Sequence, residues 1–340
     1  MQHDTVVPTR DVDPVWVTGV GVLTGQGAGG RDAVRLLRAR FLADDTGPAG
    51  DLPLGDVDFA RLIGGKGLRH LSRGTLALLA AAYLALEDAG AAGPGAPQGE
   101  DAGVAAGTAT ATAGLVAGFD RTTLVAGPQA ANPAVFPQTV WNGPACQVAI
   151  RHALRGPNVT LSSGMNSGLD AVLAGARLIR RGRARMVLAG GFEEITPYFR
   201  VLLEPEAGET QPCLSEGAAV LVLERRSAAE ARGARPLGAI DEGASAFAPC
   251  PGEAGARLRA LLDGIPAAGA TARAWCLGPC PAALADRGTT VDLCARAGHG
   301  GGLTGALAVA LAASGAGMPE LVAASDRDGR VAALVVGPIA

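Results

Sequence analysis

The sequence predicts an α/β protein built from layers of strands and helices. Short runs of Val, Leu, Ile and Ala alternate with longer helical segments, and several of these runs contain no polar residue. Strands of this kind are buried on both faces, which indicates sheets covered by helices on each side. Aromatic residues make up 4% of the chain and Gly numbers 50, so small side chains fill the interior. Such a composition suits closely packed α/β layers.

Hydrophobic periodicity places the elements in both halves of the chain. The predicted strands of the first half are Val15–Leu23, Gly103–Gly107, Asn158–Ser162 and Met186–Ala189. The predicted helices there are Arg31–Arg40, Ser72–Ala89, Gln147–Leu154 and Ser167–Arg181. The second half repeats the alternation, with strands at Ala218–Leu223 and Val331–Val336 and helices at Ala256–Leu262 and Gly302–Ala313.

Composition argues against several classes of function. The net charge is −3, Lys66 is the only lysine and no basic block occurs, so no nucleic-acid partner is expected. No apolar run is long enough to span a membrane and no signal peptide precedes the first strand, which predicts a cytoplasmic protein with a flexible tail over residues 1–14. Its six cysteines are then expected to be reduced. Cys276 and Cys280 are spaced C-x-x-x-C, but no histidine flanks them, and neither a metal nor a cofactor is predicted.

A glycine-rich stretch after the first predicted strand matches a dinucleotide-binding pattern. Gly25, Gly27 and Gly30 fit G-x-G-x-x-G, and Asp44 and Asp45 lie within reach of the usual downstream acid. Chance matches are frequent in a chain with 50 glycines, and these glycines begin beyond the natural end of the strand. We therefore interpret the stretch as a flexible turn, with nucleotide binding as the weaker alternative.

Four groups of motifs carry a family resemblance. The first is VTGVGVLT at Val17–Thr24, and the second is FPQTVWN at Phe136–Asn142, followed by Gln147–Thr160. The third is LSSGMNSGLD at Leu161–Asp170, continued by Ala176–Gly182 and by LAGGFE at Leu188–Glu193. The fourth is SEGAAVLVLE at Ser215–Glu224, followed by AGHG at Ala297–Gly300. In this order they resemble the β-ketoacyl synthases of type II fatty acid and polyketide synthesis.

This resemblance implies a thiolase-like fold of five layers, αβαβα, with two pseudo-repeated halves. The likeness is close up to residue 194 and patchy afterwards. We therefore predict an N-terminal half over residues 15–194 and a shortened C-terminal half over residues 195–340.

The resemblance also locates the nucleophile's position. The family places a cysteine at a strand-to-helix elbow written Ala-Cys-Ala-Ser-Gly, where the helix dipole lowers the thiol pKa and backbone N–H groups form an oxyanion hole. This sequence has Gly164-Met-Asn-Ser-Gly168, so Met165 stands where the cysteine is expected. Met165 can also be interpreted as a filler of an irregular gap in the core. On either interpretation no thioester forms here, because a thioether cannot carry an acyl group.

The other catalytic positions are altered as well. Of the two family histidines that stabilise the enolate, the first aligns with Leu277 and the second with His299. The family lysine aligns with Cys294, and the glycine-rich gating loop aligns with the polar stretch Ser325–Arg330. His299 alone is expected to be a structural residue. We therefore predict no catalytic residue among Met165, Leu277, Cys294 and His299.

Two segments of the first half resemble the family's interface and tunnel. The predicted dimer interface consists of Asn158, Val159, Thr160, Leu161 and Ser162. The predicted substrate tunnel is lined by Thr108, Thr110, Thr112, Phe136, Ser163 and Met165. An inactive subunit with an intact dimer surface resembles the chain length factor of type II polyketide synthases.

The resemblance implies a non-catalytic subunit that forms a heterodimer with an active ketosynthase and meets an acyl carrier protein through that complex. Chain length factors usually carry glutamine at the elbow, so Met165 leaves both an aromatic-polyketide and a polyene-type pathway open. The alternative is a re-purposed acyltransferase or cyclase that acts on acyl-carrier thioesters and uses His299 with Ser163 or Cys294. No activity is expected from the chain alone.

Overall fold

The computed structural model of the chain describes residues 13–43, 46–92, 98–110, 112–205, 211–286, 288–315 and 317–339. The predicted tail up to residue 12, and Asp44 and Asp45 of the glycine-rich pattern, lie outside the described residues. Within these ranges no helix has the length and apolar character needed to cross a membrane.

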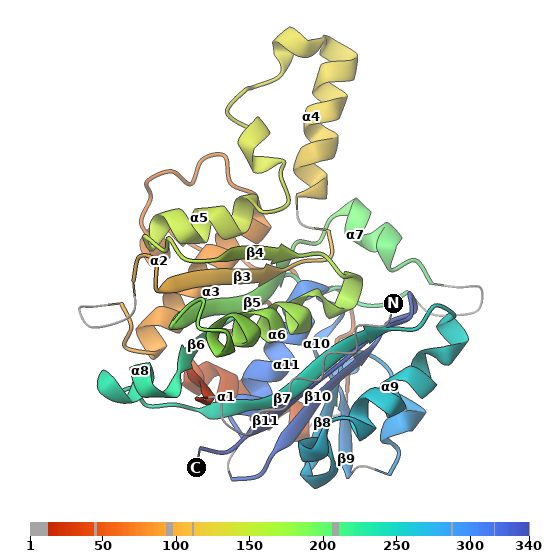
Figure 1. Cartoon of the computed structure of the whole chain (residues 1–340). Coiled ribbons are helices and arrows are strands. Elements are labelled where there is room, and N and C mark those ends of the chain that lie inside the picture. The colour runs from red at the N-terminus through yellow and green to blue at the C-terminus, as the bar shows by residue number, and fades with distance from the viewer. Residues whose placement is uncertain are drawn as a thin grey trace.

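The described strands form one continuous 11-stranded sheet (Figure 1). Its order is β4-β3-β5-β6-β1-β7-β11-β10-β8-β9, and β2 pairs with β1 outside this path. The first six strands are β1 (Val15–Thr24), β2 (Gly27–Gly29), β3 (Ala102–Gly107), β4 (Asn158–Leu161), β5 (Met186–Glu193) and β6 (Gly217–Arg225). The remaining strands are β7 (Gly238–Phe247), β8 (Arg273–Cys276), β9 (Thr289–Asp292), β10 (Glu320–Ser325) and β11 (Arg330–Gly337).

The two halves of this sheet have the same topology. In the first half β3 is parallel to β4 and β5, and the antiparallel strands β6 and β1 follow. In the second half β8 is parallel to β9 and β10, and the antiparallel strands β11 and β7 follow. The predicted division between residues 194 and 195 does not match this repeat, because β6 pairs with β5 and β1. The strand repeat divides the chain between Arg225 and Gly238.

Helices cover and separate the two halves of the sheet. α6 and α11 pack against each other between the halves, α3 packs on β1 and β6, and α9 packs on β7 and β11. The helices of the first half are α1 (Arg31–Ala43), α2 (Phe59–Ile63), α3 (Arg73–Asp88), α4 (Ala113–Ala126), α5 (Gly143–Arg151), α6 (Ser167–Arg180) and α7 (Pro197–Leu202). Those that follow are α8 (Arg226–Ala231), α9 (Ala254–Asp263), α10 (Leu293–Ala297) and α11 (Gly302–Ala313).

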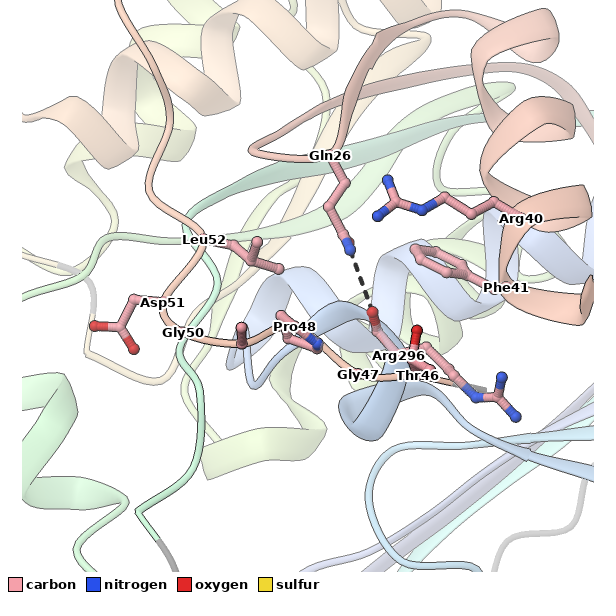
Figure 2. A pocket seen from close by; sticks show the side chains of 11 residues that line it. Gln26, Arg40, Phe41, Thr46, Gly47, Pro48, Gly50, Asp51, Leu52 and Arg296 are labelled. Carbon is pink, nitrogen blue, oxygen red and sulfur yellow. Dashed lines mark hydrogen bonds between the residues drawn. The ribbon is translucent and has the colours of Figure 1, made fainter. Parts of the chain in front are cut away.

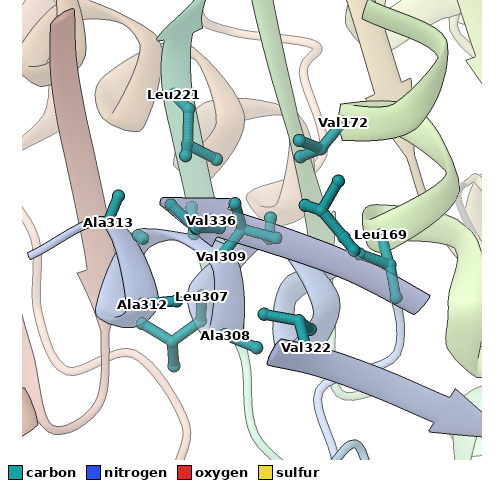
Figure 3. Packing of buried hydrophobic residues seen from close by; sticks show 14 of the residues in the cluster. Leu169, Val172, Leu221, Leu307, Ala308, Val309, Ala312, Ala313, Val322 and Val336 are labelled. Carbon is teal, nitrogen blue, oxygen red and sulfur yellow. The ribbon is translucent and has the colours of Figure 1, made fainter. Parts of the chain in front are cut away.

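Three apolar clusters fill the spaces between these layers. Along β11, Ala332, Leu334 and Val336 belong to the central cluster, whereas the alternate residues belong to the cluster under α9. Figure 3 shows the central cluster, in which side chains of α6 and α11 meet side chains from both halves of the sheet. A third cluster lies between α3 and the first half of the sheet. The order is therefore α-β-α-β-α with repeated halves, and the predicted thiolase-like fold is confirmed.

The glycine-rich stretch is a paired strand rather than the flexible turn that we predicted. Gly27 and Gly29 of β2 pair antiparallel with Thr24 and Val22 of β1. The Arg31 amide at the start of α1 donates to Asp88 Oδ1 at 3.0 Å. A dinucleotide fingerprint requires a tight turn into a helix whose N-terminus receives the pyrophosphate. Here the turn is a hairpin, and the carboxylate of Asp88 already accepts a hydrogen bond from the N-terminus of α1. The geometry therefore does not support nucleotide binding.

Helix α5 starts earlier than the predicted span Gln147–Leu154, at Gly143, and it ends at Arg151. Pro144 lies in its first turn, where a missing N–H costs nothing.

The strands of the second half from β7 to β10 have no counterpart in the sequence prediction. Three of them are short or mix polar with apolar residues, so their periodicity is weak.

A buried ion pair joins α1 to the second half of the sheet. Arg38 Nη1 donates to Glu320 Oε2 at 2.7 Å, and Arg273 Nη1 and Trp275 Nε1 donate to the same carboxylate at 2.8 Å each. The Glu320 side chain is 5% exposed. Burial acts to raise the pKa of Glu320, but the hydrogen bonds from Arg38 and Trp275 and the charges of Arg38 and Arg273 outweigh it, so this pKa lies below its ordinary value.

We expect Glu320→Gln to lower the free energy of unfolding by about 3 kcal/mol at pH 7, because it leaves a buried arginine without its partner. The folded-state pKa of Glu320 is depressed, so the carboxylate's stabilisation is complete above the unfolded pKa and disappears as pH falls through the folded value. Urea unfolding from pH 7 to pH 3 should therefore show the two proteins converging in acid. A difference that stays constant over this range would contradict the prediction.

Candidate functional site

The predicted elbow is present between β4 and α6. After β4 the chain enters a single 3₁₀ turn, Gly164–Asn166, and α6 begins at Ser167. Gly164 has a φ of 64°, in the left-handed region that favours glycine. The Ser163 amide donates to Ser167 Oγ at 2.9 Å, and this hydroxyl donates to the Gly164 carbonyl oxygen at 2.6 Å. Hydrogen bonds between residues of the elbow therefore stabilise its conformation.

Met165 lies at the tip of this elbow. Its half-buried side chain packs against an apolar cluster that contains Ala109, Phe199, Leu203 and Leu214. The side chain therefore fills a gap between the elbow and α7, as expected of methionine. Sulfur held in a thioether offers no nucleophile here.

Glycines allow the elbow to meet the second half of the chain. A Cβ on Gly168 would lie 1.8 Å from the Gly302 carbonyl oxygen, and a Cβ on Gly302 would lie 2.3 Å from the Gly107 carbonyl oxygen. The N-terminal ends of α6 and α11 thus cross backbone to backbone beside the end of β3. This crossing fixes the elbow relative to the segment that precedes α11.

A buried carboxylate that we did not single out lies beneath this crossing. Glu193 is fully buried and accepts from the amides of Ala109 at 2.7 Å and Thr110 at 3.1 Å. The Thr110 hydroxyl donates to it at 2.6 Å and the Thr108 hydroxyl at 3.2 Å. Burial raises the pKa of Glu193. The carboxylate holds the end of β3 in place.

Most of the predicted tunnel residues use their side chains in hydrogen bonds within the chain. Thr108 and Thr110 direct their hydroxyls to Glu193, and the Thr112 hydroxyl donates to the Thr139 carbonyl oxygen at 2.8 Å. Ser163 Oγ donates to Asp170 Oδ2 at 2.6 Å. The hydroxyls of these four residues therefore form hydrogen bonds within the chain. Of the other two predicted tunnel residues, Phe136 is 58% exposed and Met165 is half-buried.

Two degenerate positions of the second half, Leu277 and Cys294, are buried. Leu277 is buried in the central apolar cluster, whereas Met165 belongs to the cluster beside α7. Cys294 is buried in α10, and burial raises the pKa of its thiol, an effect that nearby Asp292 increases. A thiol of this kind is inert as a nucleophile at neutral pH.

His299 reaches the elbow region through its backbone. Its amide donates to the Cys213 carbonyl oxygen and its carbonyl accepts from the Ser215 amide, each at 2.8 Å. Between them Leu214 packs in the same cluster as Met165. Burial lowers the pKa of the imidazole, Asp292 acts against this shift and Arg327 acts with it. His299 is thus anchored through its backbone, and Ser163 Oγ, its partner in the alternative function, donates to Asp170.

A cavity of about 230 Å³ opens beside α10. It lies between α1, the loop over residues 46–52 and Arg296, and Gln26 Nε2 donates to the Arg296 carbonyl oxygen at 3.2 Å. Figure 2 shows Gln26, Arg40 and Phe41 directed toward this space, while the Asp51 carboxylate is turned away from it. The elbow does not line the cavity. Within the described part of the chain, no three His, Cys, Asp or Glu side chains are placed to hold a metal ion.

The thiolase-like layers and the elbow after β4 define a protein of the ketosynthase type. Residues 12–229 match the family model described as the N-terminal domain of β-ketoacyl synthase. The chain therefore belongs to the β-ketoacyl synthase family.

Curated relatives match parts of the chain. It is 34% identical over 131 residues to 3-oxoacyl-[acyl-carrier-protein] synthase 2 of Rhizobium meliloti (strain 1021), which covers 32% of this chain and 31% of that one. It is 32% identical over 257 residues to the tetracenomycin polyketide synthase ketoacyl synthase alpha subunit of Streptomyces glaucescens, with 65% of this chain and 59% of the relative covered. The chain thus spans between about a third and three fifths of the length of these relatives.

Solved structures share the fold over nearly the whole chain. The structure described as the ishigamide ketosynthase/chain length factor superposes with a TM-score of 0.80 at 24% identity and covers 96% of this chain and 100% of that one. A type II polyketide synthase ketosynthase in complex with its acyl-carrier protein, AntDE:AntF, gives a TM-score of 0.83 at 20% identity, with 97% and 100% covered.

Proposed function

We propose that this chain is a non-catalytic ketosynthase-like subunit that pairs with an active ketosynthase in type II polyketide or polyene synthesis. The observation that carries the proposal is the thioether of Met165 at an otherwise intact elbow. The family fold is present while the elbow holds no nucleophile, which favours a role other than condensation. A subunit that contributes surface to an active partner fits this combination.

The free edge of β4 supports a partner that adds strands to the sheet. Among the strands of the described residues, β4 is the last on its side of the sheet, and β3 is its neighbour. The Val104 amide donates to the Pro157 carbonyl oxygen and the Thr108 amide to that of Leu161, so alternate residues of this segment bond to β3. Thr160 therefore turns its N–H and C=O to the open edge. An edge with free N–H and C=O groups is a template for another strand.

Apolar side chains are also exposed on the segment between β3 and β4. α4 is rich in apolar residues, yet none of its residues is buried, and Figure 1 shows it standing away from the body on the β4 side. A helix of this kind needs a partner for its apolar side chains. The large apolar side chains exposed on this segment are Leu124, Val125, Phe136, Val140, Trp141 and Ile150.

The chemistry of this surface fits a partner with the same fold. An open strand edge flanked by exposed apolar helices is complementary to a second copy of such an edge. Pseudo-symmetric interfaces of this type are apolar and bury a large surface area, roughly 2,000 Å² or more. One similar structure is described as a ketosynthase/chain length factor, and another as a ketosynthase in complex with an acyl-carrier protein. We therefore infer a heterodimer with an active ketosynthase, which meets the carrier protein through the complex.

We propose that the acyl tunnel of this complex passes Phe136 and Met165. These two predicted lining side chains are apolar and not buried, whereas the hydroxyls of Thr108, Thr110 and Ser163 are engaged in internal hydrogen bonds. An acyl chain can therefore be received against an aromatic ring and a thioether without breaking a buried hydrogen bond.

Co-expression tests this function. The chain should form a stable one-to-one complex with a cysteine-containing ketosynthase encoded beside it, and mass determination by light scattering after gel filtration should show it. The isolated chain is expected to form a weak homodimer or to be poorly soluble, because the α4 surface then stays uncovered. A stable monomer with no affinity for that ketosynthase would contradict the proposal.

A further inference from the structure

The elbow amide that should receive an oxyanion already has an acceptor within the chain. The Met165 N–H donates to Asp326 Oδ2 at 3.1 Å, across 161 positions of sequence. In nucleophile elbows the backbone N–H groups of this region stabilise the developing oxyanion. A carboxylate therefore lies at the position where a thioester carbonyl oxygen would otherwise be bound.

The fit between this carboxylate and the elbow is tight. A Cβ on Gly164 would come within 2.8 Å of Asp326 Oδ2 and within 3.9 Å of Asp328 Oδ2. A side chain at position 164 would therefore crowd the Asp326 carboxylate at the amide of the following residue. The left-handed conformation of Gly164, with φ at 64°, also turns this amide toward the second half of the chain.

The turn that carries Asp326 is anchored from both sides. The Asp326 amide donates to the Arg330 carbonyl oxygen at 2.8 Å, and the Gly329 amide donates to the Asp326 carbonyl oxygen at 3.0 Å. The Ala248 amide at the end of β7 donates to the Gly329 carbonyl oxygen at 2.8 Å. Asp326 is thus presented by a closed hairpin turn between β10 and β11, which is fixed to a neighbouring strand.

We propose that Asp326 is an internal occupant of the elbow's oxyanion position and excludes a thioester carbonyl from it. A full negative charge is a stronger acceptor for this N–H than a neutral carbonyl oxygen, and it also repels an oxygen that gains charge. The chain is therefore closed to acyl transfer in two independent ways, by the loss of the nucleophile and by this carboxylate. This inference deepens the proposed non-catalytic role, but it concerns the isolated chain and is tested without a partner.

Methionine-specific labelling makes the contact observable. The chain has four methionines, and apart from the first residue they are Met165, Met186 and Met318, so ¹⁵N-methionine gives few amide signals. We expect Asp326→Ala to accelerate hydrogen exchange of the Met165 amide by roughly 10–100-fold, as expected for loss of a hydrogen bond to a charged acceptor. Acetate should reverse part of this acceleration saturably, because it can take the vacated position.

Asp328→Ala is the matched control, since Asp328 lies on the same turn but accepts no bond from this amide among those that the structure shows. It should leave exchange at Met165 unchanged and insensitive to acetate. If Asp326→Ala does not fold, Asp326→Asn keeps the shape, and the Met165 amide should exchange faster in this variant than in the native protein, because a neutral amide oxygen is a weaker acceptor than a carboxylate. Equal exchange at Met165 in the Asp326 and Asp328 variants would overturn the inference. Failure to bind a ketosynthase would count only against the proposed function.

Discussion

Replacing Thr160 by proline should weaken the proposed heterodimer while leaving the chain folded. Thr160 turns its N–H to the open edge of β4, so proline removes a hydrogen bond to the partner strand but none to β3. The partner carbonyl that loses its donor is then buried without one, which costs about 1–3 kcal/mol, and the proline ring also obstructs the approach of a strand. We expect affinity for the ketosynthase to fall by roughly 100-fold or more.

Two variants separate this effect from misfolding. Thr160→Val keeps the amide and the β-branched shape, so it should bind the partner nearly as well as the native chain. Val159→Pro removes an amide that faces β3 and should lower the melting temperature of the isolated chain, whereas Thr160→Pro should not. Titration calorimetry and thermal unfolding measure the two quantities. Native affinity of Thr160→Pro would show that β4 is not the contact strand.

The sequence predicts the fold best where one element is buried on all sides. Helix α11 has the predicted bounds, because all of its residues are buried and Thr304 is the only polar one among them. The strand β7 escapes prediction, since polar residues such as Asp241 and Glu242 interrupt its apolar pattern. Its partners β1 and β11 are far away in the sequence, and only their pairing makes a strand of it.

The candidate site shows the same limit. The elbow and Met165 are found because the strand, the glycines and the helix are contiguous in sequence. Asp326 and Glu193 are missed as parts of the site because their significance depends on contacts with residues far away in the sequence. Glu193 lies within a motif that we used for the family, and a glutamate at the end of a buried strand could have been noticed. For Asp326 the only local signal is a polar turn, Ser325–Arg330, which is typical of any hairpin.

Restoring the thiol with Met165→Cys should not restore condensation. The positions aligned with the first histidine and the lysine hold Leu277 and Cys294, and both are buried without a donor for the enolate. Loss of one oxyanion-type donor costs about 100–1,000-fold in kcat, so two independent losses reduce the rate by roughly 10⁴–10⁶-fold. The carboxylate of Asp326 lies 3.1 Å from the amide of the new cysteine and disfavours its thiolate.

Chain elongation by the isolated Met165→Cys protein, measured by mass spectrometry of the carrier-bound product from malonyl- and acyl-carrier thioesters, is therefore expected to equal that of the native chain. A ketosynthase with its own cysteine serves as the positive control. Adding Asp326→Asn should speed alkylation of the introduced thiol by iodoacetamide, because a neutral amide no longer opposes the thiolate, and should still give no elongation. Adding Asp328→Asn, which removes the same charge from the same turn, should speed alkylation less. Elongation by the single variant would show that the second half of the chain still supports the enolate and that the subunit is an enzyme lacking only its nucleophile.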